Sequence, residues 1–197
     1  VGYSQDAVTL LALSQYIKNL GYQAVASMND TALSIPLAIK AGLGEYGRHG
    51  LLITPELGPR LRIGKVFTDL PLAHDRPMRF GVKQFCDVCR KCSDACPPSA
   101  IPDSTPSEVT YNQSNILGIN KWTVDGEKCF GFWAQQVTDC SICLRVCPYN
   151  RPYPFWINKI RHRLMGSFLR GLMLRLDNFL GGGERKPPKW WWDKKDS

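Results

Sequence analysis

The chain has 197 residues, of which 44% are hydrophobic and 21% are charged, and this composition excludes a wholly disordered protein. Its formal net charge is +8, and almost all of the excess lies in residues 151–197, which hold eleven Lys/Arg against four Asp/Glu. No uninterrupted apolar run reaches the roughly 18 residues of a membrane-spanning helix, so the sequence predicts none.

Residues 1–79 are expected to alternate helices and strands. Apolar residues at helical spacing predict a helix that begins with Ser4 as its N-cap and ends at Gly21. The other elements predicted in this part are a strand over 22–27, a helix over 35–41 and two strands over 51–54 and 61–67. Together they indicate an α+β fold.

The eight cysteines form two motifs. The first motif is Cys86-x2-Cys89-x2-Cys92-x3-Cys96-Pro97, and the second is Cys129-x10-Cys140-x2-Cys143-x3-Cys147-Pro148. The first is the bacterial [4Fe–4S] motif, in which the fourth cysteine binds the other cluster when two are present. The short spacings let three thiolates wrap around one cubane, and the following proline turns the chain away. We therefore expect residues 80–150 to be a ferredoxin-like domain with two [4Fe–4S] clusters.

Exchange of the fourth cysteine between the motifs defines two predicted ligand sets. The first ligand set is Cys86, Cys89, Cys92 and Cys147. The second ligand set is Cys96, Cys129, Cys140 and Cys143. The wide spacing in the second motif predicts an inserted loop over 130–139 beside the second cluster. Four disulfides or tetrahedral zinc sites are the alternatives, and the motif spacing with its following proline disfavours both.

A basic C-terminal extension, 151–197, follows the cysteines. After a break at Pro152 and Pro154, residues 155–180 are predicted to form one or two helices, ended by the glycines at 181–183. Their apolar face consists of Ile160, Leu164, Phe168, Leu172 and Leu176. We expect this face to pack on its own domain, the alternative being a membrane surface. Residues 186–197 are predicted to be a tail.

Seven short segments of the first part add a more specific pattern. They are Gly-Tyr-Ser at 2–4, Ser-Met-Asn-Asp at 27–30, Ser-Ile-Pro-Leu-Ala at 34–38, Ala-Gly-Leu-Gly at 41–44, Gly-Leu-Leu-Ile-Thr-Pro at 50–55, Leu-Gly-Pro-Arg-Leu-Arg at 57–62 and Lys-Val-Phe-Thr-Asp at 65–69. Together with both cysteine motifs, through about Tyr149, they resemble the corrinoid-dependent reductive dehalogenases. Because the chain begins at Val1 without Met or an export signal, we expect a C-terminal fragment of such a catalytic subunit.

The resemblance implies a cobamide, which is a corrinoid cofactor, held in a nitroreductase-like domain of which residues 1–79 are part. The two clusters would reduce its cobalt, and an organohalide would lose its halide, as in anaerobic organohalide respiration. The same resemblance implies that Tyr3 supplies the proton, that Arg62 stabilises its phenolate and that Asn29 positions it. Arg60 is the alternative to Arg62. Without the resemblance, the three residues could equally be packing, surface and turn residues.

Three further expectations concern pocket residues and histidines. By resemblance, Trp133 lines the substrate or corrin pocket, and the alternative is that it packs over a cluster. His49, His74 and His162 are scattered and form no metal pair at helical spacing. We expect no axial histidine on cobalt.

The expected partners are an organohalide substrate, a membrane anchor protein and an upstream electron donor, with no nucleic acid. The expected location is peripheral, on the outer face of the cytoplasmic membrane. Two other functions stay open. An epoxyqueuosine reductase acting on a tRNA base would need basic residues around the mouth of its active site. An electron-transfer module without catalysis would leave Tyr3, Asn29 and Arg62 unexplained.

Overall fold

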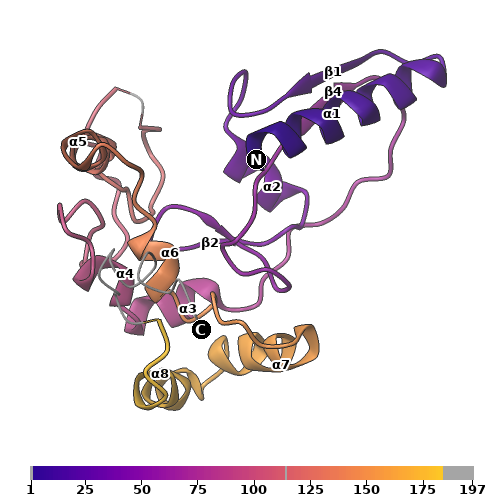
Figure 1. Cartoon of the computed structure of the whole chain (residues 1–197). Coiled ribbons are helices and arrows are strands. Elements are labelled where there is room, and N and C mark those ends of the chain that lie inside the picture. The colour runs from indigo at the N-terminus through magenta and orange to yellow at the C-terminus, as the bar shows by residue number, and fades with distance from the viewer. Residues whose placement is uncertain (1, 114, 184–197) are drawn as a thin grey trace, which may run out of the picture.

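The computed structural model describes residues 2–113 and 115–183, which form a mixed α and β structure (Figure 1). The order of elements is α1 (Gly2–Asn19), β1 (Ala24–Ser27), α2 (Ser34–Lys40), β2 (Glu45–Tyr46), β3 (Leu52–Ile53), β4 (Lys65–Thr68), α3 (Val82–Val88), α4 (Lys91–Asp94), α5 (Gly126–Gln136), α6 (Ile142–Val146), α7 (Phe155–Met165) and α8 (Arg170–Phe179). Strand β1 pairs antiparallel with β4, and β2 pairs antiparallel with β3. The predicted tail, 186–197, lies outside the described residues.

Helix α1 packs on the ribbon formed by β1 and β4 through the buried side chains of Leu10 and Ile17. A Cβ on Gly64, just before β4, would lie 2.5 Å from the side chain of Leu10, so the helix rests directly on backbone there. The helix stops before Gly21, as predicted, because this glycine adopts a φ of +94°. The N–H of Tyr22 then reaches back to the carbonyl of Ile17, which closes the helix end.

Two boundaries predicted in this part are wrong. Ser4 is not the N-cap, because α1 already includes Gly2. The strand predicted over 61–67 begins only at Lys65, because its partner β1 is four residues long and the ladder ends where β1 ends.

The inserted loop predicted over 130–139 is helical as far as Gln136, and this prediction is therefore wrong for most of the segment. The reason lies upstream, at Asp125. This residue is the N-cap of α5, and its Oδ1 accepts a hydrogen bond from the N–H of Lys128 at 3.1 Å.

Glu45 in β2 links the first part of the chain to the cysteine-bearing part. Its Oε2 accepts hydrogen bonds from the N–H groups of Phe80, Gly81 and Val82 at 2.5, 2.8 and 3.2 Å. N–H groups at the start of a helix have no partner inside it, and a negative charge is favourable at that end. The carboxylate therefore caps α3, the helix that carries Cys86.

The main core surrounds the cysteines. Its buried members are Ile53, Val82, Phe85, Cys86, Cys89, Trp122, Cys147, Tyr149 and Met165. The ring of Tyr149 meets Phe85 edge to face at a centroid distance of 5.5 Å and Phe80 at 6.1 Å. These side chains come from all three predicted segments of the chain, so the first ligand set is enclosed by residues from each of them.

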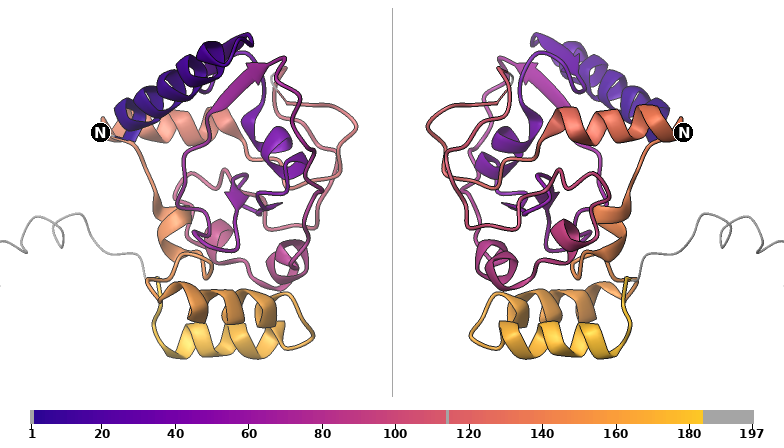
Figure 2. Two further views of the ribbon diagram at one scale, coloured as in Figure 1. Left: turned by 90° about the vertical axis from the view of Figure 1, so that its right-hand side faces the viewer. Right: turned by 90° about the vertical axis from the view of Figure 1, so that its left-hand side faces the viewer.

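Helices α7 and α8 lie side by side at the end of the molecule opposite α1 (Figure 2). Their predicted apolar face does not pack on the domain, and that prediction is wrong. Phe168 is 88% exposed, and most of the other predicted face residues are exposed as well. The buried side instead holds Met165 together with the polar residues Asn158, His162 and Asp177. A network of ion pairs and hydrogen bonds attaches the helix pair to the cysteine region.

Candidate functional site

The first ligand set lies around one cavity. Cys86 is in α3, Cys89 caps its C-terminal end, Cys92 is in α4 and Cys147 follows α6. These four cysteines line the cavity together with His49, Phe85, Pro148 and Tyr149. Helices α4 and α6 pack on each other, which brings Cys147 to the first motif. The structure thus brings together the four thiols that the motif spacing groups.

Burial keeps these thiols in their neutral form. It raises the pKa of Cys86 to about 12 and the pKa of Cys147 well above its ordinary value, and the neighbouring cysteines add to the effect. A thiol with such a pKa is not a thiolate nucleophile at neutral pH. A bound metal, by contrast, deprotonates a coordinating thiol outright. In the absence of metal these thiols are therefore poor nucleophiles, and a bound metal would have to supply the energy that deprotonates them.

In the second ligand set, Cys129 lies on α5, Cys143 on α6, Cys140 in the segment just before α6 and Cys96 just after α4. Burial, followed by Cys140, Cys129 and Cys96, raises the pKa of Cys143 to about 11. Burial, followed by Cys96 and Cys140, also raises the pKa of Cys129. The N–H of Ala100 points at the Sγ of Cys96 at 3.3 Å, a type of contact that tunes iron–sulfur clusters. Cysteines of the second ligand set therefore lie close enough to raise the pKa of one another's thiols.

The geometry bears on the alternatives to iron–sulfur clusters. All eight cysteines lie in the described part of the chain and are free thiols. Within residues 2–113 and 115–183, no three His, Cys, Asp or Glu side chains converge on a single metal ion. A cubane has iron at four corners, each taking one thiolate, so its ligands are spread around a larger body. The donor set is therefore compatible with the cubanes that the motif spacing predicts.

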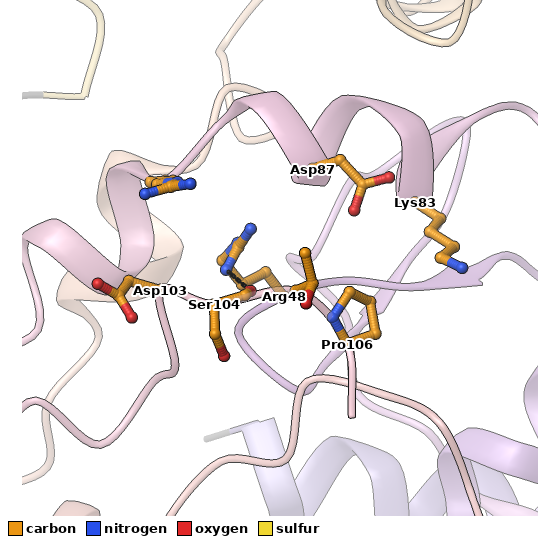
Figure 3. Close-up of a pocket in the computed structure, with 8 residues that line it drawn as sticks. Arg48, Lys83, Asp87, Asp103, Ser104 and Pro106 are labelled. Atoms are coloured by element: carbon orange, nitrogen blue, oxygen red, sulfur yellow. Dashed lines mark hydrogen bonds between the residues drawn. The ribbon is translucent and has the colours of Figure 1, made fainter. Parts of the chain in front are cut away.

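Arg48, which the sequence did not reveal, is buried beside the first ligand set and is only 1% exposed. Its Nε and one terminal nitrogen donate to the Cys86 carbonyl at 3.2 and 3.0 Å, and its other terminal nitrogen donates to the carbonyls of Pro102 and Ser104. Figure 3 shows it between α3 and the segment that holds Ser104. The guanidinium also lies 4.7 Å from the ring centroid of Trp122.

No carboxylate among the described residues forms an ion pair with Arg48. A buried charge without a counter-charge is costly. Asp87 and Asp103 line the same pocket as Arg48 without forming an ion pair with it, and a cluster held by four thiolates at the first ligand set would add net negative charge beside it. The donor set and its surroundings therefore fit an anionic cluster.

Asp177 of α8, also missed from the sequence, joins the helix pair to the cysteine region. It accepts hydrogen bonds from the Nε and a terminal nitrogen of Arg151 at 2.8 and 2.7 Å and from the Nζ of Lys91 at 2.5 Å. Burial opposes ionisation, but the hydrogen bonds from Arg151 and Lys91 outweigh it and lower the pKa of Asp177. Because Lys91 lies between Cys89 and Cys92, this carboxylate anchors the first motif.

Tyr3, Asn29 and Arg62, the three residues that the resemblance singles out, lie together in the structure although they are far apart in the chain. The Nδ2 of Asn29 donates to the phenol oxygen of Tyr3 at 3.2 Å. The guanidinium carbon of Arg62 lies 3.8 Å from the centroid of the Tyr3 ring. The hydrogen bond from Asn29, followed by Arg62, lowers the pKa of Tyr3. Both neighbours favour the phenolate, which makes the phenol a stronger acid.

Two other predicted residues lie outside this group. Arg60 is exposed, and its backbone N–H bonds to the carbonyl of Leu57. Trp133 is on α5 and is 36% exposed, and Figure 1 shows α5 lying apart from α1. The structure therefore brings Arg62 and not Arg60 to the ring of Tyr3, and it does not bring Trp133 to that ring.

Comparison with known proteins places these features among relatives. A family model described as a 4Fe-4S double cluster binding domain matches residues 85–150. The chain is 46% identical over 153 residues to the tetrachloroethene reductive dehalogenase of Desulfitobacterium hafniense, which covers 76% of this chain and 28% of that protein. It is 38% identical over 198 residues to the tetrachloroethene reductive dehalogenase of Sulfurospirillum multivorans, which covers 98% of this chain and 39% of that protein. The chain thus spans less than half the length of these relatives.

Two kinds of solved structure match this chain, and the reductive dehalogenase matches it better than the epoxyqueuosine reductase does. A protein described with the words "Reductive dehalogenase structure suggests a mechanism for B12-dependent dehalogenation" matches with a TM-score of 0.75 and 32% identity over 88% of this chain and 25% of that one. The epoxyqueuosine reductase of Streptococcus thermophilus matches with a TM-score of 0.56 and 27% identity over 77% of this chain and 40% of that one. None of the helices within residues 2–113 and 115–183 has the length and apolar character needed to cross a bilayer.

Proposed function

Because this chain belongs to the reductive dehalogenase family, we propose that the protein is an oxidoreductase that reduces the carbon–halogen bond of an organohalide and releases halide. The observation that carries the proposal is the contact of Tyr3 with Asn29 and Arg62 in a chain that also holds a double-cluster domain. Replacement of halogen by hydrogen consumes two electrons and one proton. Two one-electron clusters and one acidic tyrosine match these requirements.

The proposed proton donor is the phenol O–H of Tyr3. Loss of its proton leaves a phenolate, which the N–H of Asn29 and the positive charge of Arg62 both stabilise. Arginine stays charged at any physiological pH, so this stabilisation is present throughout turnover. The Tyr3 residue is 47% exposed in this chain, so the side chain is not enclosed by the described residues.

The proposed cofactors are two [4Fe–4S] clusters and a corrinoid. When bound, the corrinoid would supply the reducing centre at which the carbon–halogen bond is broken. The exposed side chains of Tyr3, Asn29 and Arg62 leave one face of the chain open to such a group. We assign residues 1–79 to part of a nitroreductase-like corrinoid-binding domain, 80–150 to the ferredoxin-like domain and 151–197 to the C-terminal extension.

The proposed ligands are the first ligand set for one cluster and the second ligand set for the other. The common cavity of the first set and the mutual influence of the second support this assignment. Cys96→Ala tests it, because Cys96 belongs to the first motif in sequence but would bind the second cluster. EPR should show damage to the cluster of Cys129 and Cys140, with the cluster of Cys86 retained. Loss of the Cys86 cluster alone would contradict the exchange.

Two other functions have weaker support. An epoxyqueuosine reductase is a more distant match in both identity and TM-score. A pure electron-transfer module would not need the neighbours that make Tyr3 more acidic. Release of halide from a chlorinated substrate by the purified enzyme would exclude both alternatives.

We propose a peripheral location on the outer face of the cytoplasmic membrane, with a membrane anchor protein and an upstream electron donor as partners. The support is the surface of α7 and α8, where Phe168 and Phe179 are 88% and 87% exposed and Lys159, Arg163 and Arg175 are exposed nearby. If the anchor protein binds this surface, the enzyme should stay in the membrane fraction at high salt. It should leave that fraction when the anchor protein is removed. Retention in the membrane fraction without any partner after a carbonate wash would contradict a peripheral location.

The decisive experiment is Tyr3→Phe in the full-length enzyme. This change removes the acidic O–H but keeps the ring, so halide release should fall by about 10²–10⁴-fold, the usual contribution of a general acid. Both cluster signals and the corrinoid content should be retained. Near-normal halide release would assign the proton to another donor.

A further inference from the structure

The loop between β2 and β3 carries a buried histidine that the proposed reaction does not use. The N–H of Gly47 donates to the carbonyl of Leu51 and the N–H of Gly50 to the carbonyl of Gly47, both at 2.9 Å. A Cβ on Gly47 would lie 2.9 Å from Cε1 of His49, so this glycine makes room for the imidazole. His49 is 5% exposed and lines the cavity of the first ligand set.

One hydrogen bond determines where His49 carries its proton. The N–H of Leu51 donates to Nδ1 at 3.2 Å, so Nδ1 is an acceptor. A neutral imidazole that accepts at Nδ1 carries its proton at Nε2. An imidazolium has N–H groups at both nitrogens and could not accept this bond, so the ring is neutral. His49 therefore presents a fixed Nε2–H donor.

This donor has no hydrogen-bond partner among the described residues. Buried donors in native proteins are almost always satisfied, so an unsatisfied one calls for an acceptor. Within residues 2–113 and 115–183, the other buried side-chain atoms without a partner are Ser14 Oγ, Tyr149 OH and His162 Nε2. Of these three residues, Tyr149 also lines the cavity. The acceptors that the first ligand set would bring into the cavity are the sulfurs of a cluster.

We propose that the Nε2–H of His49 donates a hydrogen bond to a sulfur of the [4Fe–4S] cluster held by the first ligand set and thereby raises the reduction potential of that cluster. One-electron reduction adds a negative charge to the cluster, and a hydrogen bond to its sulfur stabilises the reduced form more than the oxidised form. Arg48, the preceding residue, places its guanidinium on the carbonyl of Cys86 and adds positive charge. A single loop thus supplies both a donor and a cation to one cluster.

The inference rests on the proposed ligand sets and not on dehalogenation. The full-length protein is therefore first assayed for about eight iron and eight acid-labile sulfide per chain, and separately for halide release. An iron content below this would refute the ligand sets, whereas a lack of halide release would refute only the proposed reaction.

The test is an EPR-monitored redox titration of the clusters in four full-length variants. His49→Phe keeps a ring of similar size but removes the donor. We expect the one-electron equilibrium of one cluster to shift about tenfold towards the oxidised form, a fall of about 59 mV in its potential, with the other cluster unchanged. His49→Gln keeps an N–H at similar reach and should restore the original potential to within a threefold change in that equilibrium. The affected cluster is identified as the one whose signal changes in Cys89→Ser.

His162→Phe is the matched control. His162 is a second buried histidine, 1% exposed, whose Nδ1 contacts the carbonyl of Pro55 at 2.8 Å and which does not line the cavity. This variant should leave both potentials unchanged. An unchanged potential in His49→Phe, or an equal fall in His162→Phe, would overturn the proposal. If His49→Phe fails to hold the cluster, the result for His49→Gln tests the proposal instead. A shifted potential or a lost cluster in His49→Gln would also overturn the proposal.

Discussion

Replacement of Asp177 by asparagine should lower the free energy of unfolding by about 3 kcal/mol. Removal of one partner of a buried ion pair typically costs about 3–5 kcal/mol, because the other charge is left buried and unpaired. The Arg151–Asp177 pair meets this condition, with side chains that are 5% and 6% exposed. The lower end of the range applies because Arg151 also donates to the carbonyls of Val146 and Gly182, which would still solvate it. Lys91 is 22% exposed and contributes less.

The assay is urea unfolding of the full-length protein under anaerobic conditions, followed by cluster absorbance and by circular dichroism. Asp125→Asn is the matched control, because Asp125 pairs at 3.5 Å with a Lys128 side chain that is 59% exposed and because asparagine is an equally good helix cap. This control should change stability by less than about 0.5 kcal/mol. A loss in Asp177→Asn no larger than the loss in the control would refute the argument that a buried charge is left without a partner.

Three further outcomes are expected. The folded-state pKa of Asp177 is lowered, so its contribution to stability should be complete above the ordinary carboxyl pKa of about 3.9. This contribution should be lost as the pH falls through the folded-state pKa. The acid unfolding curves of the original protein and of Asp177→Asn should therefore converge in that pH range. Gly166→Ala should lower stability by about 1–3 kcal/mol in thermal unfolding, because its Cβ would overlap the Phe80 carbonyl, whereas Gly171→Ala, with open space around it, should not. Arg62→Ala should slow halide release strongly, Arg62→Lys should slow it less, and a larger effect of Arg60→Ala would correct the choice of arginine.

Rules that concern single residues or short motifs predicted the end of the first helix and the grouping of the cysteines. Gly21 was expected to end the first helix, and its positive φ does so. The cysteine spacing grouped Cys147 with the first motif, and the structure places it in the same cavity. In both cases the signal is contained in one residue type or one short motif.

The features that the sequence did not reveal depend on partners that are distant in the chain. Lys91 and Asp177 are 86 residues apart, and no spacing rule connects them. The burial of Arg48 follows from carbonyls at 86, 102 and 104, which cannot be recognised in the sequence as acceptors. Periodicity identified the apolar face of residues 155–180, but it could not tell which side of the helices faces the domain. That side is determined by Asp177 and its cations.

The arrangement of the cysteines also bears on how the protein is made. Each group draws its members from both motifs, and Cys147 is 51 residues after Cys96. At roughly 5–20 residues per second, a ribosome needs about 3–10 s to add that segment. With the proposed ligand sets, neither cluster can have all four of its thiolates until the second motif has left the exit tunnel. Iron–sulfur assembly would therefore be a late event of biosynthesis that acts on both sites together, and a chain truncated between the motifs would mature neither cluster.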